Sequence, residues 1–485
     1  MQLAFRMRVG RCDKKMVILA LECSTSATKA LVYDTESRRQ WLCSENFDTS
    51  VADAFTQDMD AAYSTLIRCG RRAVAAAGLT CDTVVLVSTW HSLLLCNKGG
   101  LPAGRIRLWS DLEGAEFTGR IARDAELKRR IYERTGCILH ATYPVWKYHY
   151  LRENGLVPDG LSVYSQGEYL FRRMTGVRAV SLNIASGSGM LNLHTLRWDD
   201  EMLKFVGIKE ECLGRLCGED HSEPLTAEPA GLLGLKQGTP VYVGGADGAM
   251  TQLGCDALGE RRMTVSVGTS GALRTAYPQP VFSPSLSTWC YYLTGGKYLA
   301  GAATNGAGNC VNLLVAQCGK PVKELDSMLA GRDYSGAPVF LPFIFGERCP
   351  GWSESPYGGF SAGSQELADR YYAVLEGVLF NLYQCYEDLA VAGGVPDEIR
   401  VSGGIVNSPV WLQMCADIFG RQIQAAEMQH ASLLGGVVLA AQANGEDIGK
   451  DVWNSHKTVR PNDARSVFYK TRYQKYLDYY RQKGL

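Results

Sequence analysis

Residues 18–34 read ILALECSTSATKALVYD: an apolar run, a short segment rich in hydroxyl side chains, and a second apolar run. The two apolar runs predict a pair of antiparallel strands, and the polar segment predicts the turn between them. Ser and Thr are common in plain turns, but hydroxyls and backbone N–H groups in a tight turn, followed by a lysine, can also hold phosphate. On these residues alone both interpretations stay open.

A second segment of the same design lies about half a chain further on. Residues 263–277 read MTVSVGTSGALRTAY, again with Thr-Ser in the turn and a basic residue in the second strand. Gly268 and Gly271 would allow a ligand to approach the backbone closely, and Thr269 and Ser270 repeat the hydroxyls. Two such hairpins indicate a duplicated domain core, and the repetition favours phosphate binding for both turns.

The length and the hydrophobic periodicity predict an α/β protein of two domains. A chain of 485 residues exceeds the ~250–300 residues at which a single core stops growing. Hairpins mixed with helix-then-strand units are typical of α/β domains. We expect helices at 59–77, 166–175, 366–393, 409–419, 431–443 and from 466, and further strands at 83–88, 241–245 and 398–404.

Charge and cysteine usage exclude several classes of function. Lys plus Arg and Asp plus Glu both total 50, so no net field draws the chain to nucleic acid or to an anionic membrane. The sixteen cysteines form no CxxC pair, which favours reduced thiols and a cytoplasmic protein. Residues 1–15 are basic and lack the apolar stretch of a secretory signal, so we expect a disordered tail or an upstream-start extension.

An aspartate follows one of the predicted strands in the stretch YVGGADGAM (242–250). Asp247 lies between glycines at a strand end, which suits a general base that faces a cleft. An Asx-turn or a helix N-cap is an equally common use of such an Asp, and the stretch alone does not decide between them.

Other strand ends carry groups that could bind a ligand. RVSGGIVNSPVWLQMCADIFG (400–420) reads as strand, glycine turn and helix, which can point amides at an anion or can simply be a tight βα loop. STWHSLLL (88–95) and RLWSDLEG (107–114) place Trp90, His91, Trp109 and Asp111 near strand ends, as a polyol pocket would need. A single His or Trp is more often a core residue. The motifs GxxxxGK[ST], GxSxG, HExxH and a well-placed GxGxxG are absent from the sequence.

Taken in order, these motifs resemble those of the FGGY carbohydrate kinases of the actin-like ATPase superfamily, and most of all its gluconate-kinase-like and xylulokinase-like members. The resemblance runs from about Met16 to Gly445 and includes TGCILHATYPVWKYHYLREN (135–154), NIASGSGMLNLHTLRWDDEML (183–203), LPFIFGERCPGW (341–352) and RYYAVLEGVLFNLY (370–383). It implies two actin-like (ribonuclease H-like) α/β domains with a ligand cleft between them. We expect a sugar-binding domain with the first phosphate hairpin at 16–250 and a nucleotide-binding domain at 251–485.

The resemblance also implies a reaction and a set of site residues. The reaction is ATP- and Mg²⁺-dependent phosphorylation of a sugar, polyol or sugar acid, with Asp247 as the catalytic base. The phosphate loops match Ser24, Thr25, Ser26, Thr28 and Lys29, and then Gly268, Thr269 and Ser270. The adenine nucleotide positions match Asn305, Gly306, Gly403, Gly404 and Asn407. The sugar positions match Trp90, His91, Trp109, Asp111 and Lys147, with Glu347 and Arg348 as further candidates. The only partner implied is the small-molecule substrate; the choice between a monomer and a homodimer stays open.

Two departures from the family pattern lead to an alternative hypothesis. The usual Asp-x-Gly-Thr of the first hairpin is Glu22-Cys23-Ser24-Thr25 here, so Glu22 would support Mg²⁺ through water, and Ser24 would limit backbone approach to phosphate. The usual W-x-D-x-R has Glu113 in place of arginine, which would repel a substrate carboxylate. The alternative is therefore a catalytically weakened sugar- or nucleotide-binding protein of the same fold.

Overall fold

The computed structural model describes residues 15–158, 160–259, 261–353, 355–426, 428, 430–453 and 456–483. Of the expected N-terminal tail, residues 1–14 lie outside the described residues. The chain divides into two compact units. Unit 1 comprises the described residues up to Asp256, together with Tyr292–Gly295 and His430–Trp453, and unit 2 comprises the remaining described residues from Ala257 onward.

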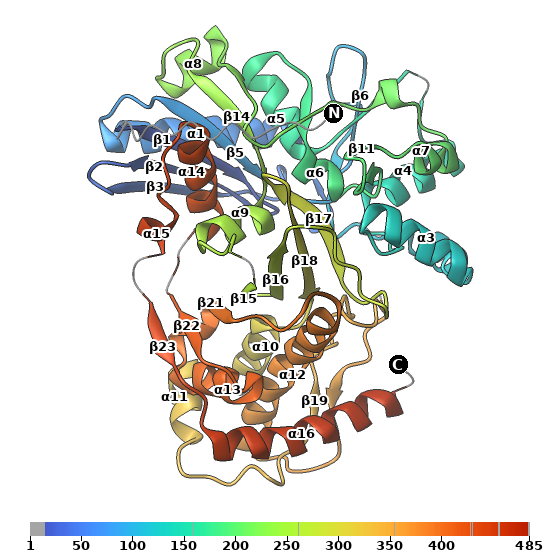
Figure 1. Ribbon diagram of the computed structural model, residues 1–485, viewed down its shortest axis with the longest axis vertical. Coiled ribbons are helices and arrows are strands. Elements are labelled where there is room, and N and C mark those ends of the chain that lie inside the picture. The colour runs from blue at the N-terminus through green and yellow to red at the C-terminus, as the bar shows by residue number, and fades with distance from the viewer. Residues whose placement is uncertain are drawn as a thin grey trace. The chain divides into compact units, whose positions relative to one another are not determined.

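Unit 1 is built on a six-stranded sheet of order β13-β14-β5-β1-β2-β3 (Figure 1). The strands are β1 (Val17–Cys23), β2 (Ala27–Asp34), β3 (Gln40–Asn46), β5 (Thr83–Ser88), β13 (Ser222–Pro224) and β14 (Pro240–Ala246). The first hairpin is confirmed, because β1 and β2 pair antiparallel from Val17↔Asp34 to Cys23↔Thr28. Strands β1, β5 and β14 run parallel, so their carboxyl ends meet at one edge of the sheet.

Helices cover both faces of this sheet. On one face α1 (Met59–Ala77), α5 (Gln166–Thr175) and α8 (Ala227–Leu233) enclose the main core of the unit. On the other face α14 (Ala431–Ala443) packs against β1, β5 and α9 (Asp247–Gly254). Helix α1 has the predicted bounds because Asp58 accepts a hydrogen bond from the N–H of Ala61 at its start, and Gly78 adopts the left-handed conformation that ends it.

Unit 2 contains a seven-stranded sheet of order β17-β18-β16-β15-β21-β22-β23. Its strands are β15 (Arg262–Val267), β16 (Gly271–Tyr277), β17 (Trp289–Thr294), β18 (Lys297–Thr304), β21 (Glu398–Gly403), β22 (Ile423–Ala425) and β23 (Lys457–Val459). From β18 to β23 the pairings are antiparallel, antiparallel, parallel, parallel and antiparallel. From β3 to β13 in unit 1 they follow the same succession. The duplicated core predicted from the two hairpins is thus confirmed.

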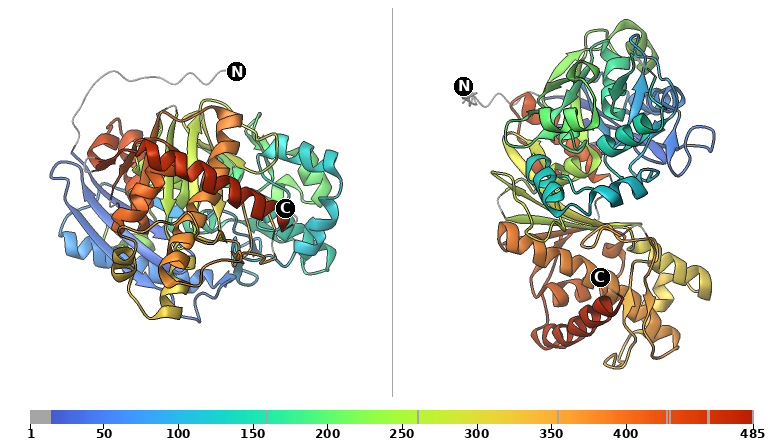
Figure 2. Two further views of the ribbon diagram at one scale, coloured as in Figure 1. Left: turned by 90° about the horizontal axis from the view of Figure 1, so that it is seen from below. Right: turned by 90° about the vertical axis from the view of Figure 1, so that its right-hand side faces the viewer.

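The helices of unit 2 include α10 (Gly308–Cys318), α11 (Val322–Met328), α12 (Leu367–Gly393), α13 (Pro409–Phe419) and α16 (Asp463–Gln482). Helix α16 runs along the outside of unit 2 in Figures 1 and 2 and buries a row of tyrosines, Tyr469, Tyr473, Tyr476 and Tyr480. It begins three residues before the predicted start, because Asn462 caps it by accepting from the N–H of Arg465.

Shorter elements complete the fold. The helices are α2 (Ala115–Ile121), α3 (Ala125–Thr135), α4 (Pro144–Glu153), α6 (Leu182–Ser186), α7 (Asp200–Val206), α15 (Gly449–Val452), η1 (Glu210–Cys212) and η2 (Gly404–Asn407). The strands are β4 (Thr56–Gln57), β6 (Leu94–Cys96), β7 (Ile106–Arg107), β8 (Ser162–Tyr164), β9 (Ala179–Ser181), β10 (Leu191–Asn192), β11 (Arg197–Trp198), β12 (Arg215–Cys217), β19 (Phe340–Leu341) and β20 (Gly359–Phe360).

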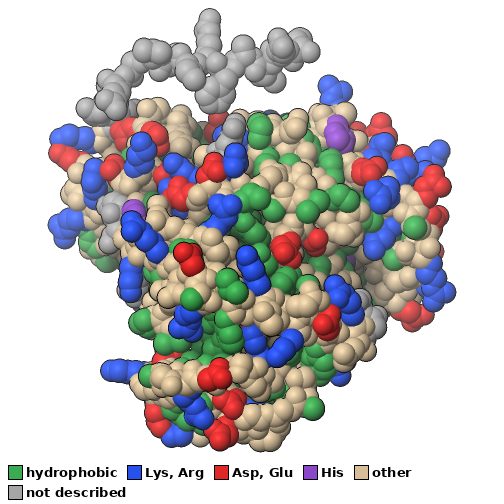
Figure 3. All heavy atoms as spheres, turned by 60° about the horizontal axis from the view of Figure 1, so that its bottom comes forward, with side chains coloured by type: hydrophobic (Ala, Val, Ile, Leu, Met, Phe, Trp, Pro, Cys, Tyr) green, Lys and Arg blue, Asp and Glu red, His purple; other side chains and the backbone are tan. Residues whose placement is uncertain are grey.

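The surface agrees with the balanced composition. On the face drawn in Figure 3, Lys and Arg side chains are interspersed with Asp and Glu. Among the described residues, no helix combines the length and the apolar character that a membrane crossing needs.

Candidate functional site

The carboxyl edge of the unit 1 sheet collects three of the predicted segments. The turn Ser24–Ser26 follows β1, the segment Thr89–His91 follows β5, and Asp247 follows β14 as the first residue of α9. They meet there because the three strands are parallel neighbours. The sequence predicted each of these strand ends separately, and the parallel pairing in the structure brings the three together.

The first turn, Ser24–Ser26, is held by a hydrogen bond to Ala27 and by the side chains of Gln57 and Trp109. The N–H and the Oγ of Ser24 both donate to the carbonyl of Ala27 at 2.9 Å. The Nε2 of Gln57 donates to the carbonyls of Ser24 and Thr25, both at 2.7 Å. The Nε1 of Trp109 donates to the Oγ1 of Thr25 at 3.0 Å. Ser26 is exposed. The turn thus connects the residues predicted to bind phosphate with the residues predicted to contact the sugar. We call the latter, Trp90, His91, Trp109 and Asp111, the sugar wall.

Two residues expected in this seat lie elsewhere. The side chain of Thr28 is fully buried and turned into the core, so its hydroxyl is not presented at the turn. Lys29 lies opposite Glu22 across the hairpin, and its Nζ is 3.4 Å from Glu22 Oε2. Since side chains alternate along a strand, Thr28 and Lys29 project from opposite faces of the sheet. Lys29 extends on the same face as Glu22, which α14 covers.

The residues near the turn fit a metal ion that arrives with a nucleotide better than a resident one. No group of three or more His, Cys, Asp or Glu side chains among the described residues could hold a metal. Glu22 is a buried carboxylate whose two oxygens already contact Ser432 and Lys29. Mg²⁺ in kinase sites needs only one or two carboxylates besides phosphate and water, so Glu22 can support it at most through water.

Trp90 and His91 form a buried wall after β5. The indole Nε1 of Trp90 donates to the carbonyl of Asn183 at 3.1 Å, and the ring lies directly against Gly187. His91 has a φ of 61°, which is unusual for a residue with a side chain. Its Nδ1 lies 2.6 Å from the carbonyl of Gly187, so Nδ1 carries the proton.

Trp109 and Asp111 extend this wall. Asp111 is buried, and one of its carboxylate oxygens lies 2.7 Å from Arg107 Nη1. The same Nη1 lies 2.6 Å from Glu113 Oε2. Glu113, which replaces the family arginine, is therefore paired with Arg107, and one guanidinium is shared between two carboxylates.

Lys147 is buried, and its ammonium group binds backbone carbonyls. Its Nζ donates to the carbonyls of Asp111, Thr142 and Ala141, at 2.7, 2.8 and 2.9 Å. Burial lowers the pKa of the ammonium to about 7, and the nearby Asp111 carboxylate opposes that shift. All three donors are used, so Lys147 ties the segment after Trp109 to the segment before α4 and does not point into open space.

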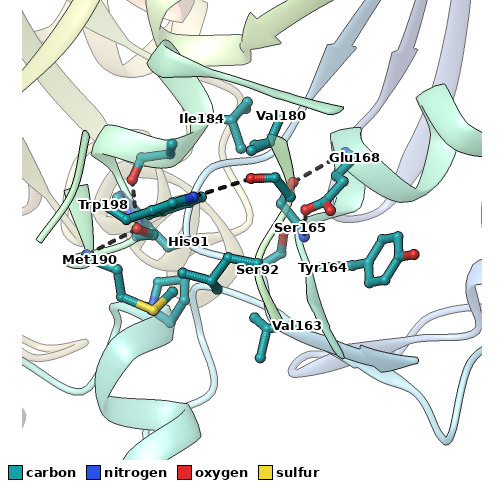
Figure 4. Close-up of a pocket in the computed structure, with 15 residues that line it drawn as sticks. His91, Ser92, Val163, Tyr164, Ser165, Glu168, Val180, Ile184, Met190 and Trp198 are labelled. Carbon is teal, nitrogen blue, oxygen red and sulfur yellow. Dashed lines mark hydrogen bonds between the residues drawn. The ribbon is translucent and has the colours of Figure 1, made fainter. Parts of the chain in front are cut away.

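A small cavity of about 30 Å³ lies beside His91 (Figure 4). It is lined by His91, Ser92, Ile184 and Trp198 among others, and Trp198 Nε1 donates to the carbonyl of Gly214 at its wall. This volume holds about one water molecule and is too small for a sugar. Of the predicted sugar residues, Trp109 is partly exposed.

Asp247 is partly buried at the start of α9. It is not the N-cap, since Ala246 holds that position, and its Oδ1 accepts from the N–H of Gly248 at 2.6 Å. A carboxylate in the first turn of a helix is stabilised by the helix dipole. The N-cap alternative for this residue is thus excluded by the structure.

Unit 2 carries a larger pocket at the carboxyl ends of β15 and β21. It has a volume of about 290 Å³, close to the lower bound for small-molecule sites. Four predicted residues line it: Gly268, Thr269, Gly404 and Asn407. Val267 and Gly403 are neighbours across the two parallel strands, which places both glycine turns at the same edge.

The start of α10 closes this pocket from one side. The N–H of Gly308 donates to the carbonyl of Gly268 at 2.8 Å, and the N–H of Asn309 donates to the carbonyl of Thr269 at 3.1 Å. A Cβ at position 308 would lie 2.4 Å from the carbonyl oxygen of Gly268, so only glycine allows this approach. The start of α10 therefore holds the first two residues of the second turn, while the carbonyl of the exposed Ser270 accepts from the N–H of Gly268 at 3.0 Å.

Other predicted nucleotide residues support the pocket and do not line it. Gly403 has a φ of 92° and packs against Val267, while Gly306 packs against the carbonyl of Pro342. Asn305 donates to the carbonyl of Phe345 at 3.2 Å. Glu347, a further sugar candidate, is buried and accepts from Tyr480 Oη and Gly351 N, each at 2.9 Å.

Sequence reasoning missed several lining residues. They are Val311, Asn312, Val322, Tyr371, Ser408 and Trp411, which lie on or beside α10, α11, α12 and α13. Tyr371 and Trp411 fall within stretches already singled out, but helical periodicity alone assigns aromatic residues to a core. Asn183, Gln57 and Gln166 were missed as well, because a buried amide has no local sequence signal.

Comparison with known proteins decides the family. The FGGY family of carbohydrate kinases, N-terminal domain, matches residues 17–254, and the C-terminal domain of the same family matches residues 263–444. The chain belongs to the FGGY family of carbohydrate kinases.

Relatives of this FGGY kinase agree in fold and in kind. The gluconokinase of Bacillus licheniformis is 28% identical over 409 residues, which cover 79% of each chain. The ligand-bound xylulose kinase of Lactobacillus acidophilus has a TM-score of 0.89 at 25% identity and covers 95% of this chain and 97% of its own. The gluconate kinase of the same organism has a TM-score of 0.88 at 26% identity and covers 96% and 97%.

The expectations about fold and reaction class are thereby confirmed. This FGGY kinase has the two-domain actin-like fold, and it is an enzyme that phosphorylates a carbohydrate-type hydroxyl with ATP as the phosphate donor.

Proposed function

We propose that this FGGY kinase phosphorylates a small sugar, polyol or sugar acid, with Asp247 as the general base for the attacking hydroxyl. The observation that carries this proposal is the grouping of Asp247 with the turn Ser24–Ser26 and the segment Thr89–His91 at one sheet edge. A carboxylate at a strand end, beside aromatic and hydrogen-bonding side chains, is suited to hold and deprotonate a hydroxyl.

The pocket of unit 2 is the proposed seat of the nucleotide. Its volume of about 290 Å³ and its aromatic residues, Tyr371 and Trp411, suit a nucleoside. The turn Gly268–Ser270 offers hydroxyls and backbone N–H groups to the phosphates, as does the turn Ser24–Ser26 in unit 1.

Phosphoryl transfer depends mainly on positioning and on charge stabilisation, and the residues present are sufficient for both. Asp247 would accept the proton of the attacking hydroxyl, while Trp109 and Asp111 orient the carbohydrate. Lys147 holds the carbonyls of Asp111 and Thr142, and Thr142 Oγ1 in turn donates to the carbonyl of Trp109 at 2.7 Å. Mg²⁺, when bound with ATP, would neutralise phosphate charge, with Glu22 in support through water.

The charges of the sugar wall favour a neutral polyol or ketose over a sugar acid. Arg107 is shared between Asp111 and Glu113, so this group of three side chains carries a net negative charge. A substrate carboxylate close to it would be repelled. The variant Glu113→Arg tests this preference, because it restores the W-x-D-x-R pattern. It should raise kcat/KM for gluconate relative to xylitol or xylulose.

The proposed enzyme is cytoplasmic. The described cysteines are all free, as expected in a reducing compartment, and most of them are buried.

A coupled assay of ADP release tests the proposed function. The screen covers pentitols, hexitols, ketoses and aldonates, each with wild type and with Asp247→Asn. The variant should lose kcat by about 10²–10⁴-fold while its affinity for ATP stays unchanged, because only the proton acceptor is removed. Equal rates for the two proteins would refute the role of Asp247 and support a binding protein.

A further inference from the structure

One fully buried amide joins the key segments of unit 1. Asn183, the second residue of α6, is 0% exposed, and each of its polar atoms has a hydrogen-bond partner. Its Oδ1 accepts from the N–H of Ala246 at 2.9 Å, and its Nδ2 donates to the carbonyls of Tyr292 and Leu293 at 2.8 and 3.3 Å. The partners settle the orientation of the amide, since N–H groups only donate and carbonyls only accept.

The first of these bonds acts on the backbone that carries Asp247. Strand β14 changes register against β5 between Tyr242 and Gly245, and Gly244 has a φ of 64°. Such a bulge re-aims the residues that follow it. Asn183 Oδ1 holds the strand directly after this irregularity, and a Cβ at Gly245 would come within 2.8 Å of that oxygen.

The backbone of Asn183 acts on the sugar wall. Its carbonyl accepts from Trp90 Nε1 at 3.1 Å and from Ser186 Oγ at 2.8 Å. Its N–H donates to Glu219 Oε1 at 2.8 Å. Glu219 is buried, and burial raises the pKa of its carboxyl to about 8. Asn183 thus hydrogen-bonds through its side chain to the residue before Asp247 and through its main chain to Trp90.

We infer that Asn183 is a positioning residue for phosphoryl transfer. Its hydrogen bond to Ala246 sets the position of Asp247, and its hydrogen bond to Trp90 fixes that position relative to the Trp90 ring. This inference rests on the proposed role of Asp247. An error of about 1 Å in the placement of a reacting group can cost ~100-fold in rate, so one hydrogen bond directly before the base has leverage on kcat.

Asn183→Asp and Asn183→Ala together test the inference. A protonated aspartic acid has the shape of asparagine: its carbonyl oxygen can accept from Ala246, and its O–H can donate to Tyr292. When ionised it places a negative oxygen against the carbonyls of Tyr292 and Leu293. Burial and the neighbouring acids Glu219 and Asp247 all raise the pKa of the introduced carboxyl.

The two variants should therefore differ in their pH profiles. At pH 6 Asn183→Asp should keep kcat within about threefold of wild type, and by pH 9 it should fall to the level of Asn183→Ala, about 30- to 100-fold below wild type. Asn183→Ala should lose the same factor across this range, because alanine introduces no titratable group. KM for ATP should stay within about twofold throughout.

Asn381→Ala is the matched control. Asn381 is equally buried, lies in unit 2, and donates to the carbonyl of Cys349 at 3.0 Å. The control should lower Tm and leave kcat within about threefold of wild type. The inference is overturned if kcat of Asn183→Asp tracks wild type at every pH, or if it falls in parallel with Tm independently of pH. If Asn183→Ala does not fold, the pH series of Asn183→Asp still decides.

The inference and the proposed function fail in different ways. Wild-type activity in Asp247→Asn would remove the proposed base whatever the Asn183 variants do. An inactive Asp247→Asn together with a fully active Asn183→Ala would leave the base in place and remove only the positioning role.

Discussion

The Oγ of Ser432 donates a hydrogen bond to Oε1 of Glu22 at 3.0 Å, although 410 residues separate the two along the chain. Glu22 lies in β1 directly before the first phosphate turn, and Ser432 lies in the first turn of α14. Glu22 Oε2 is held by Lys29 from the neighbouring strand. The extra methylene of glutamate, which departs from the family pattern, thus lets the carboxylate reach a partner on α14.

The double variant Glu22→Asp with Ser24→Gly should lower turnover. The shorter carboxylate would leave Ser432 without its acceptor, and glycine would remove the hydroxyl that closes the turn on Ala27. Loss of a buried hydrogen bond to a charged group costs about 1.5–3 kcal/mol. Steady-state kinetics and Tm of the double variant and of each single variant measure this; a rise in turnover would show that the turn is a weakened site.

Gly435→Ala should be far more damaging than Gly436→Ala. A Cβ at position 435 would lie 1.7 Å from the carbonyl oxygen of Met250 in α9, whereas a Cβ at 436 would lie 3.1 Å from a side-chain methyl of Val87. Backbone of α9 cannot move aside as a methyl group can. Alanine gains about 1 kcal/mol of helix propensity at either position, so Gly436→Ala should be close to neutral in thermal melting. Similar Tm values for the two variants would contradict the close packing of α14 on α9.

The buried pair Gln57 and Gln166 should show strong energetic coupling. Gln166 Nε2 donates to Gln57 Oε1 at 2.7 Å, and Gln166 Oε1 accepts from Thr89 N at 2.9 Å. Through Gln57 this chain continues to the carbonyls of Ser24 and Thr25. Each single leucine variant leaves polar groups unsatisfied, at about 1–3 kcal/mol per group.

A double-mutant cycle of denaturant unfolding measures this coupling. The double leucine variant should be less destabilised than the sum of the singles by at least ~1 kcal/mol. KM for ATP should rise in Gln57→Leu, because the turn loses its support. Additive effects on stability would mean that the two amides act independently.

Lys147→Met should reveal the titration of the buried ammonium. In the unfolded chain the lysine keeps its proton up to pH ~10.5, and in the folded protein it releases it near its pKa of about 7. Between these values the unfolded state binds more protons, so the stability of the wild type rises with pH across this window. Methionine does not titrate.

Melting temperatures of both proteins from pH 7 to 9 check this prediction. The difference in Tm, wild type minus variant, should increase with pH. KM for the carbohydrate should rise in Lys147→Met, because the carbonyls of Asp111, Ala141 and Thr142 lose their common donor. A pH-independent difference in Tm would show that the ammonium stays charged when buried.

Local patterns in the sequence were enough to predict many elements of the fold. The helices 59–77, 166–175, 409–419 and 431–443 and the strand 83–88 have the bounds that the sequence predicts. Three of these helices start at side-chain caps, Asp58, Ser165 and Ser408, whose hydrogen bonds reach only three residues along the chain. The two hairpins, and the strand end before Asp247, were equally readable, because strand period and turn chemistry are local properties.

The tertiary structure decided what local patterns do not encode. A boundary drawn after residue 250 assigns α14 to the second half of the chain, but α14 packs on the sheet of unit 1 and supplies Ser432 to Glu22. Segments tens to hundreds of residues away decide three further points. They decide whether Thr28 faces the core, whether Lys147 binds backbone or ligand, and which amide supports Asp247. The sequence by itself determined the duplicated α/β core and the strand ends that carry the chemistry. Only packing between distant segments decided which polar side chains are available to contact a substrate and which are used to hold the site residues in place.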